Sequence, residues 1–142
     1  MAANDLPDPA MMAPIERLAA FIASGRDAAL VGVFADAEVT IIENFAPYLF
    51  NGPSAVADWS GGMREHLVGL SGLRHSFGAP QNFSRTGDEV FVSLPTEWSG
   101  AVRGQPFVEH GGWCFLLVRR GDAWRIRSYG WAVTEIRANA TA

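Results

Sequence analysis

Alternating hydrophobic and polar positions in the last third of the chain predict a long β-hairpin. Between Gln105 and Val133, bulky aromatic and branched residues recur at every second position, the period of a strand. The run Arg119-Arg120-Gly121-Asp122 interrupts this alternation, and Gly121 can adopt the positive φ that a short hairpin loop needs. We therefore predict two long strands joined by a tight turn, with Val118 opposite Ala123.

This predicted register divides the hairpin side chains between two faces. The inner face would carry Glu109, Trp113, Phe115, Leu117, Trp124, Ile126 and Ser128, and the outer face His110, Cys114, Leu116, Val118, Arg125, Arg127, Tyr129 and Trp131. Between Gly112 and Val118 both faces are apolar, so both need a cover. We expect helices on the inner face and a second copy of the chain on the outer face.

The first half of the chain predicts helices. Residues 1–13, with Pro7 and Pro9, are expected to form a flexible tail. Pro14 suits the first turn of a helix that Gly25 would end, and a second short helix would follow, capped by Asp27. A third helix would begin at Pro53, with Val56, Trp59, Met63, His66 and Leu67 on its inner face. Gly61-Gly62 would interrupt it, with a kink or close packing at that point.

The remaining segments predict strands. A strand over residues 38–45 would place Val39, Ile41 and Glu43 on one face. From residue 73 the pattern is that of strands, over 73–82, 89–101 and then the hairpin. The order of elements predicts one α+β domain over residues 14–135, with residues 136–142 frayed.

Composition excludes several classes of function. The 142 residues form one domain's worth of chain, and the net charge of -4 favours neither nucleic acid nor an anionic membrane as partner. The sequence has no lysine, which excludes a lysine Schiff base, pyridoxal phosphate attachment and a P-loop. The single Cys114 excludes an intramolecular disulfide. Without an apolar run of membrane-spanning length or a signal-peptide pattern, we expect a soluble cytoplasmic protein.

Two stretches, GRDAALVGVFADAEVT early and RGQPFVEHGGWCFLLVRRGDAWRIRSYGW late, resemble the nuclear transport factor 2-like superfamily over about residues 14–135. The superfamily includes ketosteroid isomerase, scytalone dehydratase and the SnoaL-like polyketide cyclases. The resemblance implies a curved, mixed and mainly antiparallel sheet wrapped round three helices, a cone-shaped pocket between them, and a homodimer formed through the outer sheet face. Because this fold hosts enzymes, binding proteins and assembly modules, the resemblance leaves the function open.

The catalytic groups of the isomerase do not carry over to this chain. In an alignment on Gly25 and Phe34, its tyrosine falls at Leu18, its base near Ile41 and its hydrogen-bonding acid near Cys114. Glu43, two residues further along the same strand face, and Glu109 or Ser128 on the hairpin are the nearest substitutes. The resemblance to scytalone dehydratase points instead to His75, His110 and Tyr48 as residues of the right types.

The candidate site residues follow from these placements. We expect Glu43, Glu109 and His75 as catalytic groups, and Tyr48, Trp59, Trp98, Trp113 and Ser128 as substrate-binding groups. Glu43 in an apolar cone would have the raised pKa of a general base. The three histidines, His66, His75 and His110, show no metal-ligand spacing, and no cofactor motif is present, so we expect neither a metal nor a cofactor.

Three functions fit the sequence. The first is a protein that binds a small, largely apolar or aromatic ligand without turnover. The second is a cofactor-independent lyase or isomerase in which Glu43 or Glu109 is the base and His75 or Tyr48 the donor. The third is a dimerising module whose cone is filled by its own side chains. An open cavity with converging polar groups would favour the first two.

Overall fold

A seven-stranded sheet forms the body of the molecule in the computed structural model, which describes residues 6–138. Paired strands follow the order β2-β1-β7-β6-β5-β3, and β4 pairs with β5 off this path. β1 and β7 are parallel, whereas the other pairs are antiparallel. The strands are β1 (Thr40–Ile42), β2 (Leu49–Asn51), β3 (Leu70–Phe77), β4 (Asn82–Thr86), β5 (Glu89–Val102), β6 (Gln105–Arg120) and β7 (Ala123–Ala138). The predicted α+β class and the mixed, mainly antiparallel sheet are confirmed.

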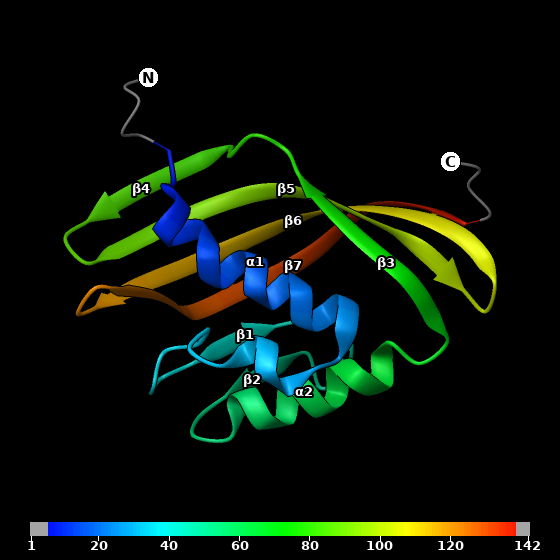
Figure 1. The fold of residues 1–142 in the computed structure, drawn as a ribbon, viewed down its shortest axis with the longest axis horizontal. Helices are drawn as coiled ribbons and strands as arrows, with labels where there is room; N and C mark the ends of the chain where they lie inside the picture. Colours follow the sequence, from blue (N-terminus) through cyan, green and yellow to red (C-terminus); the bar gives the residue numbers. More distant parts are fainter. Residues whose placement is uncertain (1–5, 139–142) are drawn as a thin grey trace.

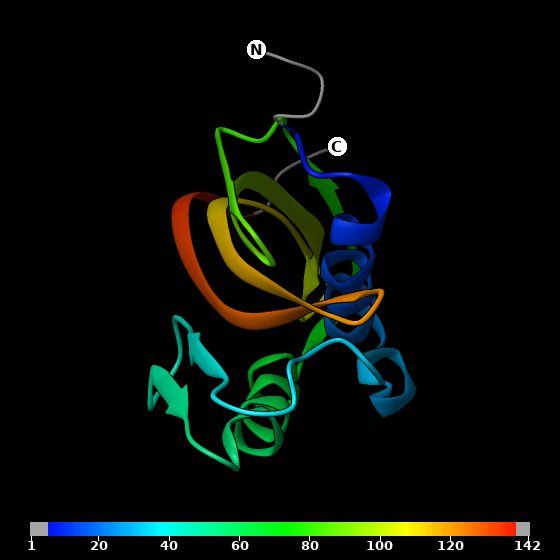
Figure 2. The same ribbon diagram turned by 90° about the vertical axis from the view of Figure 1, so that its left-hand side faces the viewer.

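The sheet is curved, and the helices lie on its concave side (Figures 1 and 2). Helix α1 (Pro9–Ser24) crosses the inner face of the long strands, and helix α2 (Ala55–His66) lies beyond its C-terminal end (Figure 1). The second expected helix is a 3-10 turn, η2 (Asp27–Leu30), and its N-cap is Arg26 rather than Asp27. The inner face of the sheet, α1 and α2 together enclose the hydrophobic core.

Helix α1 begins earlier than the sequence pattern predicts. It starts at Pro9 rather than Pro14, because the Asp8 carboxylate accepts a hydrogen bond from the Met11 backbone N–H at 2.9 Å and caps the first turn. Residues 9–13 therefore belong to the helix rather than to a tail, and residues 1–5 lie outside the described part. The predicted end is confirmed: Gly25 takes a left-handed conformation with φ of 70°.

The first strand is shorter than predicted. It spans Thr40–Ile42 instead of 38–45, because Glu38 has φ of 62° and the chain turns back after Ile42 to form β2. The predicted alternation is nevertheless correct. Val39, Ile41 and Glu43 are all buried, with 5%, 0% and 5% of their surface exposed. Glu43 thus enters the core from the end of an apolar strand face.

Helix α2 continues through Gly61 and Gly62 without an interruption, and of the two predicted alternatives the structure shows close packing, at Gly62. Gly62 lies against Phe45, and a Cβ at this position would come within 3.0 Å of the Phe45 ring. The glycine therefore serves close packing of α2 on the segment that follows β1. The predicted strand over residues 73–82 is also corrected: β3 ends at Phe77, and β4 begins at Asn82.

The register of the β6–β7 hairpin differs from the prediction. The turn contains only Gly121 and Asp122, so that Arg120 faces Ala123, and Gly121 has φ of 62°. A β-bulge follows: Leu117 faces Ile126, but the next pair is Leu116 and Ser128, which leaves Arg127 as the extra residue. A bulge of one residue exchanges the two faces of a strand beyond it. This exchange brings Tyr129 and Trp131 to the inner face and moves Ser128 to the outer face, which reverses the prediction for all three.

Candidate functional site

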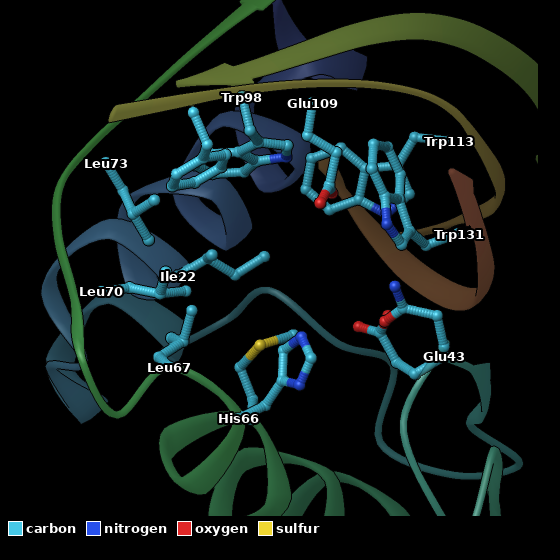
Figure 3. Close-up of a pocket in the computed structure, with 13 residues that line it drawn as sticks. Ile22, Glu43, His66, Leu67, Leu70, Leu73, Trp98, Glu109, Trp113 and Trp131 are labelled. Carbon is cyan, nitrogen blue, oxygen red and sulfur yellow. The ribbon is translucent and has the colours of Figure 1, made fainter. Parts of the chain in front are cut away.

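A pocket opens between the inner face of the sheet and α2, at the end of the molecule where β3 and β6 pass over the helix (Figure 3). Its cavity volume is about 80 Å³. A cavity needs roughly 10–15 Å³ to hold one water, so several waters or one small organic molecule fit. The wall is mostly apolar, and its residues are Ile22, Glu43, Asn44, Met63, His66, Leu67, Leu70, Leu73, Trp98, Phe107, Glu109, Trp113 and Trp131.

Glu43 is the most deeply buried ionisable group of this pocket, at 5% exposure. Its Oε2 accepts a hydrogen bond from Trp59 Nε1 at 3.0 Å and a second from the hydroxyl of Tyr129. Trp59 comes from α2 and Tyr129 from β7, and both side chains are buried. Two donors from different elements therefore hold the same carboxylate oxygen in place.

Burial raises the pKa of Glu43 above the ordinary value for a glutamate. The hydrogen bonds from Tyr129 and Trp59 lower that pKa in part, and the nearby charge of Glu109 raises it further. Burial and the adjacent Glu43 carboxylate raise the pKa of Tyr129 well above its ordinary value. Tyr129 therefore keeps its proton and remains a donor to Glu43 throughout the neutral range.

Glu109 lies on β6, at a half-buried position in the pocket wall. Burial raises the pKa of Glu109, and a hydrogen bond from the Trp131 side chain lowers it in part. Figure 3 shows Glu109 extending from its strand toward the space that Glu43 also borders. The pocket thus contains two carboxyl groups, and each has a pKa shifted toward the range in which a carboxylate can exchange protons near neutral pH.

Three tryptophans give the pocket an aromatic wall. The Trp98 and Trp113 rings are 6.2 Å apart, and the Trp113 and Trp131 rings are 5.8 Å apart in an edge-to-face arrangement. Trp131 packs on the backbone of Gly111, where a Cβ would overlap the indole ring. Nε1 of Trp113 is buried and finds no hydrogen-bond partner among the described residues. A buried donor without a partner is uncommon in folded proteins.

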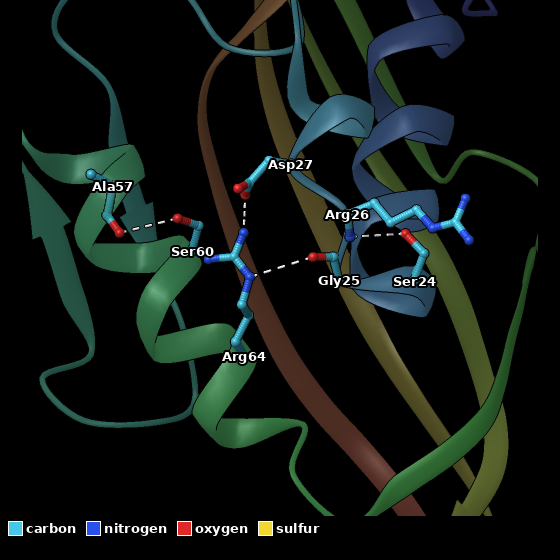
Figure 4. A network of polar contacts seen from close by, with 7 residues as sticks. All are labelled: Ser24, Gly25, Arg26, Asp27, Ala57, Ser60 and Arg64. Carbon is cyan, nitrogen blue, oxygen red and sulfur yellow. Dashed lines mark hydrogen bonds and ion pairs between the residues drawn. The ribbon is translucent and has the colours of Figure 1, made fainter.

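Helix α2 is held in place by Arg64, as Figure 4 shows. The Arg64 guanidinium forms an ion pair with Asp27, and its Nε donates to the backbone carbonyl of Gly25 at 3.4 Å. These contacts join α2 to the end of α1 and the start of η2. His66, in the last turn of α2, stacks on Phe45 with ring centroids 4.8 Å apart, and burial lowers its pKa. His66 therefore stands at the pocket mainly as a neutral imidazole near pH 7.

The structure brings four of the eight predicted site residues to the pocket: Glu43, Glu109, Trp98 and Trp113. Trp59 is fully buried behind the pocket, where it positions Glu43. Tyr48 is 60% exposed and lies outside the lining. The catalytic or binding roles of these predicted site residues stay predictions.

The other two predicted residues lie elsewhere in the fold. Ser128 faces Leu116 on the outer side of the sheet, beyond the bulge that the predicted register lacked. His75 is also outside the pocket lining. Its Nε2 is 3.0 Å from the Glu16 carboxylate, and its ring packs on Trp98.

The residues of the site that the sequence does not predict include Asn44, His66, Tyr129 and Trp131. The sequence pattern places His66 on the inner face of its helix without assigning it to the pocket. The predicted register places Tyr129 and Trp131 on the wrong face, and only the position of the bulge reveals them. Asn44 lines the pocket beside Glu43 because strand alternation stops after Ile42, where β1 ends.

Within residues 6–138, no group of three or more histidine, cysteine, aspartate or glutamate side chains is arranged to hold a metal ion. In the same part of the chain, no helix has the length and apolar character needed to cross a membrane.

Solved structures with the same fold are numerous, although the sequences are distant. A hexachlorocyclohexane dehydrochlorinase from Novosphingobium barchaimii superimposes with a TM-score of 0.75 at 11% identity, over 94% of this chain and 90% of that one. A ketosteroid isomerase-like protein from Shewanella frigidimarina gives 0.68 at 18% identity, over 88% and 96% of the two chains.

A nuclear transport factor 2-like protein of unknown function from Pseudomonas putida gives a TM-score of 0.63 at 13% identity, over 84% and 80%. No protein-family model matches the sequence, and no curated protein matches it. At these identities the likeness establishes the fold and leaves the activity to be argued from the site.

Proposed function

We propose that this chain, which has the nuclear transport factor 2-like fold, binds a small and largely apolar molecule in the pocket and uses Glu43 as a general base on it. The reaction class would be that of a cofactor-independent isomerase or lyase, which begins by removing a proton from carbon. The observation that carries the proposal is the Glu43 carboxylate, buried in an apolar pocket with one oxygen held by Trp59 and Tyr129.

The geometry of Glu43 is compatible with a general base. The two side-chain hydrogen bonds fall on Oε2 and leave Oε1 without a side-chain donor, and the backbone of Asn44 also donates to the carboxylate. The raised pKa makes the carboxylate a stronger base than a solvated glutamate.

Two of the comparison structures carry names of this class, a dehydrochlorinase and a ketosteroid isomerase-like protein. Loss of HCl from a chlorinated ring and isomerisation of an unsaturated ketone both require that a proton leave carbon. The pocket itself counts against a module whose cone is filled, since it leaves room for a small molecule. Binding without turnover differs from this proposal only in the role of Glu43.

Proton exchange with solvent tests the role of Glu43 without knowledge of the natural substrate. Small cyclic and aromatic ketones would be incubated with the protein in D₂O, and deuterium entering the carbon next to the carbonyl would be followed by NMR. We expect Glu43→Gln to slow exchange by about 100-fold or more, the usual contribution of a general base. Glu97→Gln is the matched control, because Glu97 lies on β5 beside His110, away from the pocket lining.

Exchange at the wild-type rate in Glu43→Gln would refute the role of Glu43 as a base. If no ketone of the panel exchanges in the wild type, yet ligands bind in the pocket, the reading as a binding protein without turnover would replace the proposal.

The outer sheet face supports a homodimer as a second part of the proposal. Leu116 and Cys114 are half-buried there, Phe91 is 40% exposed, and Ile42 is 54% exposed beside Gly130. Val118, expected to need the second copy, is already covered within one chain at 1% exposure. Analytical ultracentrifugation of the wild type and of Leu116→Arg tests the dimer. We expect the wild type to sediment as a dimer and the variant as a monomer. A monomeric wild type would refute the proposed homodimer.

A further inference from the structure

Apart from His66, the ionisable side chains of the described pocket wall are acidic, without a compensating arginine or lysine. Two carboxyl groups, Glu43 and Glu109, border the same space, and among the described residues that line it none is an arginine. The chain contains no lysine. The imidazole of His66 carries little positive charge near neutral pH, since burial lowers its pKa. An anionic ligand would therefore meet like charge without a compensating cation, whereas a cationic ligand would relieve the repulsion between the two carboxylates.

The aromatic part of the wall favours the same kind of ligand. Trp98, Trp113 and Trp131 are neighbours in the lining, with adjacent ring centroids about 6 Å apart. Figure 3 shows Trp98 lying across one side of the pocket and the other two rings beside Glu109. Indole rings attract cations through the negative charge of their faces, and they recognise substituted ammonium groups in this way.

From these two observations we infer that the pocket takes a small cationic amine. The ammonium group lies among the tryptophan rings and the Glu109 carboxylate. The inference deepens the proposed function, on which it rests for the location of the ligand, and it places the substrate of Glu43 among amines such as amino ketones. It excludes carboxylic acids and phosphates.

Three probes of the same shape and different charge test this inference. Choline is cationic, 3,3-dimethylbutan-1-ol is its neutral carbon analogue, and 3,3-dimethylbutanoate is an anion of similar size. Titration with each, followed by tryptophan fluorescence and calorimetry, should show choline binding at least tenfold more tightly than the alcohol, and no binding of the anion. Equal or tighter binding of the alcohol, binding of the anion, or binding of none of the three would overturn the inference.

Substitution of Glu109 tests whether this carboxylate carries the preference for a cationic ligand. Glu109→Gln should weaken choline binding about tenfold and leave the alcohol unchanged, while Glu97→Gln, away from the pocket lining, should alter neither. Thermal unfolding of both variants confirms that they remain folded. If Glu109→Gln binds choline like the wild type, the assignment of the ammonium group to Glu109 is wrong.

The outcomes separate this inference from the proposed function. If the alcohol binds as well as choline while Glu43-dependent proton exchange persists, the cation preference fails and the general base stands. If choline is preferred but no ketone exchanges, the base fails and the ligand class stands.

Discussion

Along the inner face of the long strands, every second side chain points inward at both ends. At one end these side chains form a closed apolar core, and at the other they line the pocket. At one end, which we call the closed end, Val90, Val92, Leu94, Phe115, Leu117 and Ile126 are each 1% exposed or less. At the other, the same strands β5 and β6 contribute Trp98, Glu109 and Trp113 to the pocket. The strand pattern does not distinguish the ends. The difference lies in what covers them.

The closed end is covered by α1 and the segment that contains Val33 and Phe34. The backbone N–H of Ile126 donates to Val33, and the N–H of Ala35 donates to Ile126, so that segment lies directly on β7. At the pocket end, Arg64 joins α2 to Asp27 and Gly25. The space that remains makes room for buried carboxyl groups, which a dry core would exclude.

The largest expected contrast comes from the same substitution at both ends. Leu117→Ala at the closed end removes a fully buried side chain and should lower the free energy of unfolding by about 2–5 kcal/mol. Leu70→Ala at the pocket rim removes a half-exposed side chain and should cost about 1 kcal/mol or less. Urea denaturation measures both. Equal losses would mean that the pocket end is packed as tightly as the closed end.

Adjacent glycines give a second contrast, within the pocket end itself. A Cβ at Gly111 would overlap the Trp131 ring and the backbone oxygen of Ala132, so Gly111→Ala should cost about 1–3 kcal/mol and move the indole. Gly112→Ala meets nothing within 4 Å and should change stability little. Thermal unfolding and tryptophan fluorescence report on the two effects. A stable Gly111→Ala with unchanged fluorescence would show that Trp131 is loosely held.

The smallest expected effect concerns pH. The pKa of Glu43 is higher in the folded chain than in the unfolded one, so the folded state binds the proton more tightly. The stability from this group is complete below the unfolded pKa and is lost as pH rises through the raised folded pKa.

The pKa of Glu109 is raised as well, so its contribution to the free energy of unfolding is also lost as pH rises. The free energy of unfolding should therefore fall between about pH 4.3, the ordinary glutamate value, and neutral pH. Glu43→Gln should make this fall shallower, as urea titrations at a series of pH values would show. A steeper fall in the variant would contradict the assigned direction of the shift.

Local patterns in the sequence predicted the elements and several of their faces. Alternation with a period of two placed Val39, Ile41 and Glu43 together on a buried face, and Gly121 marked the hairpin turn, because strand faces and turn conformations depend on residues close in the chain. Four of the eight predicted site residues line the pocket for the same reason.

Tertiary structure alone decided how the site is completed. The bulge that leaves Arg127 unpaired turned Tyr129 inward, and nothing in the sequence marks it, because the apolar residues beyond it would suit either face of the sheet. The hydrogen bond between Tyr129 and Glu43 joins residues 86 positions apart in the chain. A raised carboxylate pKa requires burial from several elements at once, and that environment exists only when the chain is folded.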